Sequence, residues 1–141
     1  MANAVYVAMR DGVLGSHAVR VDLDADDIRV VLTDHAGGDG APDPATDDFY
    51  DDIDGSTVAE SDALLSTKTI GVVAAGVFDA DNSTFTAVSG ASVESVNLLK
   101  ETGTPTAENL ICYFDTASGL PVTPNGGDIT VTWAAGGIFT F

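Results

Sequence analysis

The sequence predicts a mainly β protein with a single domain, an antiparallel β-sandwich or barrel with one short helix near the N-terminus. Three observations lead to this prediction. Runs of β-branched and aromatic residues recur along the chain, turn residues separate them, and helical periodicity is weak after residue 20. The chain of 141 residues is 45% hydrophobic and contains no linker-like segment, so residues 1–141 are expected to form one domain with its own core.

The short helix is predicted within residues 3–15. Apolar side chains at Val5, Met9 and Val13 follow helical spacing, and Gly15 closes the pattern early. No basic segment precedes these apolar residues, so the start is not predicted to be a signal peptide. No apolar run approaches the ~20 residues that cross a bilayer, and no membrane partner is expected.

Short strands and turns are expected over the rest of the chain. Alternating apolar residues at 19–23 favour a strand, and residues 35–48, rich in Gly, Pro and Asp, predict a loop. Residues 49–53 fit either a helical turn or an edge segment. Further strands are expected at 28–32, as several short segments within 54–103, and at 109–116, 128–133 and 137–141.

The segment 116–133 carries the strongest local pattern. The pairs Leu120–Pro121 and Thr123–Pro124 predict a stiff, extended connection, because a residue before proline avoids the helical region. Asn125–Gly127 predicts a turn with positive φ that begins the strand 128–133. Nothing in this segment activates a nucleophile or surrounds a phosphate.

The charge balance is strongly acidic. Twenty-two acidic residues and five basic residues give a formal net charge of −17, and only two of the bases are lysines. Such a surface argues against nucleic-acid binding, because few cations are available to neutralise phosphates. Mutual repulsion would strain a small fold at ordinary ionic strength, whereas ~1 M salt shortens the Debye length to ~3 Å. The composition therefore predicts a protein from a halophilic source, with a generic acidic protein as the alternative.

Two acidic stretches are candidates for binding a cation such as calcium, magnesium, sodium or potassium. Phe49 and Tyr50 interrupt the oxygen ligands of residues 43–54, and no glutamate completes an EF-hand, so a solvated loop is the preferred interpretation. Residues 78–85 fit a small cation loop, but their spacing fits a tight turn equally well. The candidate metal ligands are Asp47, Asp48, Asp51, Asp52, Asp54, Asp79 and Asp81.

No catalytic or cofactor-binding residue is predicted, and the chain is not expected to be an enzyme. His17 and His35 lie near acids, and Ser16 and Ser56 offer hydroxyls, but no Gly-x-Ser-x-Gly motif accompanies them. Cys112 lies in an apolar run and is expected to be a small core residue. One cysteine and two distant histidines give no zinc spacing, and the Gly-rich runs lack the following helix of a phosphate site.

The stretch FDTASGLPVTPNGGDITVTW, residues 114–133, resembles the C-terminal part of a family of small structural proteins from tailed phages. MANAVY resembles the start of that family, DIRVVLTD its first strand pair, and DDFYDDI its acidic-aromatic segment. GVFDADNSTFTAVSG resembles its central hairpin, and LLKETGT with NLICYFDT the strands that lead into the C-terminal part. The likeness covers almost the whole chain and is weakest in residues 36–46.

This resemblance implies a non-enzymatic virion protein, a decoration (cement) protein on the outer surface of the capsid. The implied partners are the major capsid protein and further copies of the chain, a homotrimer that matches the local three-fold symmetry of the shell. The protein would be made in the host cytoplasm and located at the capsid surface. Together with the composition, the resemblance predicts a tailed virus of a halophilic archaeon.

The sequence departs from the family pattern at two points, and two other functions are alternatives. Ala134–Gly137 stands where the family tends to have an Asp/Asn-Gly turn, and most lysines are replaced. A tail, neck or fibre-base component fits the same features. A glycan-binding or hydrolytic module would need paired carboxylates in an aromatic cleft, but only 7% of residues are aromatic. The apolar ends, residues 1–9 and 137–141, are expected to contact a partner or to fold back into the core.

Overall fold

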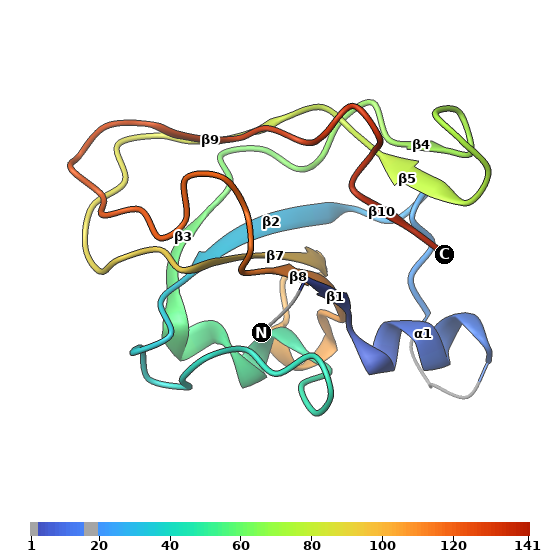
Figure 1. The fold of residues 1–141 in the computed structure, drawn as a ribbon. Helices are drawn as coiled ribbons and strands as arrows, with labels where there is room; N and C mark the ends of the chain where they lie inside the picture. Colours follow the sequence, from blue (N-terminus) through green and yellow to red (C-terminus); the bar gives the residue numbers. More distant parts are fainter. Residues whose placement is uncertain (1–2, 16–19) are drawn as a thin grey trace.

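The computed structural model describes residues 3–15 and 20–141, which contain ten short strands, one short α-helix and three single turns of 3-10 helix joined by turns and irregular segments (Figure 1). All strand pairs are antiparallel, and the sheets do not close on themselves, so the mainly β prediction is confirmed as a sandwich rather than a barrel. The elements are β1 (Ala4–Val5), α1 (Val7–Val13), β2 (Ile28–Thr33), β3 (Thr57–Glu60), β4 (Thr69–Ile70), β5 (Val77–Asp79), β6 (Ser83–Phe85), β7 (Ser95–Lys100), β8 (Leu110–Phe114), β9 (Ile129–Val131) and β10 (Phe139–Thr140).

A five-stranded central sheet, in the order β1-β8-β7-β2-β3, lies in the middle of the molecule. Strands β2 and β7 are its longest, and almost all of their side chains are buried, because both faces of the sheet are covered. Leu32 pairs with Val96, and Thr33 pairs with Ser95. Since paired residues share a face and successive residues alternate, Leu32 and Thr33 point into different layers.

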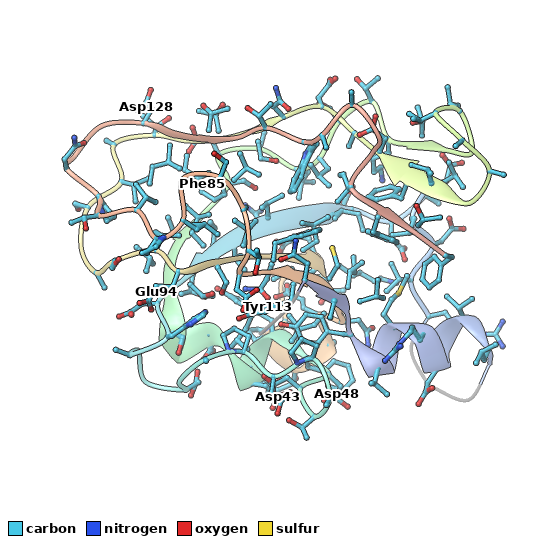
Figure 2. The ribbon with its side chains drawn as sticks, viewed as in Figure 1. Asp43, Asp48, Phe85, Glu94, Tyr113 and Asp128 are labelled. Atoms are coloured by element: carbon cyan, nitrogen blue, oxygen red, sulfur yellow. The ribbon has the colours of Figure 1, made fainter. Side chains whose placement is uncertain are left out.

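The upper layer consists of β4, β5, β6 and β9, which lie above the central sheet in Figure 1, and of β10, which pairs with β5 and descends toward the level of that sheet. It contains a three-stranded sheet, β10-β5-β4, and a two-stranded sheet, β6-β9. Its aromatic residues Phe78 and Phe85 are each 1% exposed and belong to the hydrophobic core. Figure 2 shows Phe85 between this layer and the central sheet.

The lower layer consists of α1 and residues 34–56, which lie below the central sheet in Figure 1. Single turns of helix at Tyr50–Asp52 and Asp54–Ser56 confirm the helical alternative for residues 49–53. Tyr50 and Ile53 on these turns are buried, and so is Met9 on α1. Burial of these apolar side chains therefore holds the lower layer against the sheet.

The strand expected at residues 19–23 does not form over residues 20–23, and residue 19 lies outside the described residues. Residues 23–25 form a turn instead, because aspartates bind the backbone of their own segment. The Asp22 carboxylate accepts the N–H groups of Asp24 and Ala25, both at 3.1 Å, and the Asp26 carboxylate accepts that of Asp22 at 2.7 Å. Hydrogen bonds from these aspartates to the local backbone therefore stabilise a turn more than the weak alternation of apolar residues stabilises a strand.

Two strand pairings implied by the family resemblance are also wrong. Residues 27–34 contain the single strand β2 rather than a strand pair, and residues 76–90 do not form a hairpin. Strands β5 and β6 pair with different partners in different sheets. Between them, the Asp81 N–H donates to the Ser66 carbonyl at 3.0 Å, and the Asn82 side chain accepts the Trp133 N–H at 3.1 Å. These bonds direct the chain across the upper layer.

Both ends of the described chain fold back onto the domain. Strand β1 pairs with β8, and β10 pairs with β5. Tyr6 and Ile138, next to these strands, are buried in the core. The fold-back alternative is therefore confirmed for the described residues.

Candidate functional site

The acidic stretch of the lower layer uses three of its carboxylates to hold its own turns, and one of them is Asp43, which accepts the N–H of Ala45 at 2.9 Å. Asp47 accepts the N–H of Asp43 at 2.7 Å. Asp52 accepts the N–H groups of Asp48 and Phe49 at 3.0 and 3.1 Å. Burial raises the pKa of Asp47 above its ordinary value. Figure 2 shows Asp43 and Asp48 at the lower margin of the molecule.

The structure does not gather the other cation candidates into a ligand set. Asp51 and Asp54 are exposed, and Asp79 ends β5. The Asp81 carboxylate accepts the hydroxyls of two neighbours, Ser66 at 3.1 Å and Thr67 at 2.6 Å. Within residues 3–15 and 20–141, no three His, Cys, Asp or Glu side chains form a group that could hold a metal ion. Cation binding at the predicted aspartates stays a prediction.

A chain of hydrogen bonds crosses the lower face of the central sheet. The Tyr6 hydroxyl donates to Asn97 Oδ1 at 2.7 Å, and Asn97 Nδ2 donates to Thr33 Oγ1 at 3.1 Å. The Thr33 and Ser95 hydroxyls lie 2.5 Å apart, and Ser95 Oγ lies 3.1 Å from His35 Nε2. Four members of this hydrogen-bond chain are fully buried, namely Tyr6, Asn97, Thr33 and Ser95. Each buried polar group therefore needs the hydrogen-bond partner that its neighbour in the chain supplies.

The chain of hydrogen bonds reaches the surface at His35, beside an open cavity of about 340 Å³. Glu94, Tyr113 and Asp115 also line this cavity. The backbone N–H of His35 donates to the Glu94 carboxylate at 2.7 Å. The imidazole ring of His35 stacks on the ring of Tyr113, with the two ring centroids 6.3 Å apart. Burial and the neighbouring Asp115 charge raise the pKa of Tyr113 to about 12, so its hydroxyl stays protonated at neutral pH.

The His35–Ser95 contact is the one histidine–serine pair that the structure brings together in the described residues, and sequence reasoning missed it. The Ser95 hydroxyl is fully buried between Thr33 and His35, so a substrate could not reach it. A signal was present, because Ser95 and Asn97 alternate with aliphatic residues in β7 and place two polar groups on one face.

The remaining nucleophile candidates lie elsewhere. The buried Ser56 hydroxyl donates to the Gly40 carbonyl at 2.9 Å. Cys112 is buried in β8, as the sequence predicts, and burial raises the pKa of its thiol. His17 and Ser16 lie outside the described residues.

The connection between β4 and β5 carries an exposed apolar surface, which we name the apolar tip (residues 70–76). All seven residues are exposed, and Ile70, Val72 and Val73 are 50%, 75% and 45% accessible. The Gly71 N–H donates to the Val77 carbonyl at 2.8 Å, so the backbone of the tip is held in place. The surface of the tip therefore consists of ordered, apolar side chains.

A second apolar surface lies between β9 and the preceding connection. Two adjoining cavities of about 430 and 270 Å³ share Val96, Ala117, Val131 and Thr132 in their walls. We name them together the apolar groove. Its lining contains no charged side chain. Strand β9 pairs only with β6 among the described strands, and all three of its residues line the groove.

The segment 116–133 forms a wall of this groove. The predicted turn is confirmed, because Gly126 has a φ of +84° and the Gly127 N–H donates to Asn125 Oδ1 at 3.0 Å. The Gly126 N–H also donates to the Val88 carbonyl at 2.8 Å. The Leu120–Pro121 peptide bond is cis. The segment thus forms a turn and a wall of the groove.

Residues 134–137, where the sequence lacks the Asp/Asn-Gly pair of the family, still form a turn. The Gly137 N–H donates to the Ala134 carbonyl at 2.9 Å, and Gly137 has a φ of +92°. A Cβ at this position would lie 2.2 Å from Val77 Cγ1, so glycine is required for packing as well as for the backbone.

No protein-family model and no curated protein sequence matches the chain. None of the helices in residues 3–15 and 20–141 is long and apolar enough to cross a membrane. The fold and its surfaces therefore define a class, an acidic β-sandwich with two uncharged apolar surfaces.

Proposed function

We propose that the protein is a non-enzymatic structural protein of a tailed virus that decorates the outer surface of the major capsid protein shell as a homotrimer. The observation that carries this proposal is the position of residues 114–133. This segment resembles virion structural proteins, and its residues line the uncharged apolar groove. Exposed apolar surface of this kind is typical of sites where proteins contact one another.

The size of the domain fits this role. An interface of standard size covers about 800 Å² of each partner. The accessible surface of the protein is 6610 Å². One such interface would occupy roughly an eighth of it, so the same small domain has room to contact both the shell and neighbouring copies.

The proposal includes a working environment of concentrated salt, as in a virus of a halophilic archaeon. With a net charge of −17, the folded chain concentrates negative charge that the unfolded chain spreads out. We expect the melting temperature to fall steeply when salt is lowered from ~3 M to ~0.1 M. An unchanged melting temperature, followed by circular dichroism, would contradict adaptation to salt.

Binding to purified, expanded capsids in ~3 M salt tests the location of the protein, with cosedimentation as the measurement. Decoration predicts saturable binding at hundreds of copies per particle. An unrelated protein of similar negative charge, which should stay in the supernatant, is the control. A handful of copies, or a single ring, would instead indicate a tail, neck or fibre-base component, and no binding would refute decoration.

A further inference from the structure

We infer that copies of this protein associate head to tail, with the apolar tip of one copy seated in the apolar groove of the next. This inference deepens the proposed function, because decoration by a homotrimer needs a contact between copies. The contact itself involves only this chain, so it can be tested without a capsid.

Charge limits which surfaces of two copies can meet. Each copy carries a formal charge of −17, and a contact that buried carboxylates against one another would be strongly unfavourable, because each charge would lose its hydration. Residues 69–78, which include the whole tip, contain no ionisable side chain. The lining of the groove contains none either. Tip and groove can therefore meet without burying a charge, while molar salt screens the repulsion between the remaining surfaces.

The two surfaces also complement each other in chemistry. The tip projects the branched side chains of Ile70, Val72 and Val73 into solvent. The groove offers an apolar lining, including Leu120 and Val122, with the residues of β9 in its wall. The tip is built mainly of bends and turns, so it would insert its branched side chains into the groove rather than pair its backbone along the strand edge.

The tip is ordered before it binds. The Val77 N–H donates to the Ala74 carbonyl at 3.1 Å, and the Phe141 N–H donates to the Gly76 carbonyl at 3.1 Å. Phe141, which is 54% exposed, adds an aromatic ring beside the tip. Because these bonds already fix the backbone, association costs little conformational entropy.

The tip does not fill the groove of its own molecule, because Ile70, Val72 and Val73 are exposed, so a contact between a tip and a groove joins two molecules. Figure 1 shows the β4–β5 connection at one end of the upper layer, whereas the connection that precedes β9 lies toward the opposite end. A contact between two different surfaces is heterologous, and it forms a closed ring when the rotation between copies permits. A ring of three is the form that the proposed homotrimer requires.

Two single substitutions test the tip and the groove separately. Val72→Asp places a charge on the tip, and Ala117→Asp places one in the groove; both positions are exposed, so the fold should tolerate the changes. Thr84→Asp, at an exposed position on β6 outside both surfaces, adds the same charge as a matched control. Light scattering coupled to size exclusion in ~3 M salt measures the mass of each protein and of their mixtures.

We expect the wild type and T84D to form a closed oligomer, and V72D and A117D each to be monomeric. An equimolar mixture of V72D and A117D should form a one-to-one dimer, because V72D keeps its groove and A117D keeps its tip. Circular dichroism confirms that each variant is folded.

Three outcomes would overturn the head-to-tail contact. They are a monomeric wild type at millimolar concentration, an A117D variant that still associates, and a mixture that stays monomeric. The capsid cosedimentation is scored separately. A monomeric wild type that still coats capsids would refute this contact and leave decoration standing. An oligomer that does not bind capsids would refute decoration and leave this contact standing.

Discussion

The two faces of the central sheet are covered by different chemistry. Toward the upper layer, Leu32 and Val96 line an apolar interior, and the ring of Phe114 lies 6.0 Å from that of Trp133. Toward the lower layer, the buried hydrogen-bond chain from Tyr6 to His35 runs across the same strands. One sheet is thus held by packing on one face and by directed polar contacts on the other.

The difference indicates what each face tolerates. An apolar face depends on filled volume, so it accepts side chains of similar size and shape. A buried polar chain depends on complete pairing, because one missing partner leaves the next group desolvated and unbonded. The upper face should therefore respond to changes in volume, and the lower face to the loss of single atoms.

The largest effect is expected from Phe85→Ala in the upper layer. Phe85 is 1% exposed, and its removal leaves a cavity in the core. We expect the free energy of unfolding to fall by about 3–5 kcal/mol, measured by chemical denaturation at fixed molar salt. Thr84→Ala, on the exposed side of the same strand, should change it by less than about 0.5 kcal/mol. A loss below about 1 kcal/mol for F85A would show that packing does not hold this face.

Asn97→Ala should have the next largest effect, on the lower face. It removes the acceptor of the Tyr6 hydroxyl and the amide that donates to Thr33. Because both partners stay buried, we expect a loss of about 2–3 kcal/mol in the same measurement. If N97A is as stable as the wild type, the buried polar chain does not contribute to holding the lower face.

Tyr6→Phe is a smaller change that tests whether the polar contacts act together. It removes one hydroxyl and keeps the ring, so we expect a loss of about 1–1.5 kcal/mol in the wild-type background. In the N97A background the hydroxyl has already lost its acceptor, and the loss should shrink by at least about 0.5 kcal/mol. Strict additivity of the two substitutions would argue against a connected chain.

Glu101→Gln tests a partly exposed ion pair with Arg29, which lies on the lower face of β2. Partial burial acts to raise the pKa of Glu101, but the hydrogen bond and charge of Arg29 outweigh it, so this pKa lies below its ordinary value of 4.5. The stabilisation is therefore present above that value and is lost as the pH falls through the lower, folded-state pKa.

We expect E101Q to lose about 1 kcal/mol at pH 7, with a difference from wild type that fades at pH values below the ordinary carboxyl pKa. Denaturation curves across this pH range provide the measurement. Asp51→Asn, at an exposed position, corrects for the removal of one negative charge. A difference that persists unchanged at acid pH would mean that the ion pair is not its source.

The local patterns of the sequence predicted local structure well. Helix α1 and strands β8 and β9 lie within the predicted ranges 3–15, 109–116 and 128–133, and β2 extends the strand predicted at 28–32 by one residue. The turn at residues 125–127 was also predicted, because glycine alone tolerates the required φ without strain. Such features depend on a residue and its near neighbours, which the sequence displays directly.

Pairing between distant segments was not predictable in the same way. Strands β5 and β6 are separated by three residues, yet they join different sheets, because Asp81 and Asn82 bond to segments far away in the chain. The contact of Ser95 with His35 likewise depends on the register that pairs Thr33 with Ser95. Register is set by the packing of whole strands, so it has no local signature.

By itself, the sequence determined the mainly β class, the acidic surface and the position of its turns, since composition and short-range sterics decide these. Only the tertiary structure decided that the sandwich stays open, that a buried polar chain crosses its lower face, and that the tip and the groove are exposed surfaces. The physical reason is that burial belongs to a side chain's surroundings, and residues far apart in the sequence supply most of those surroundings.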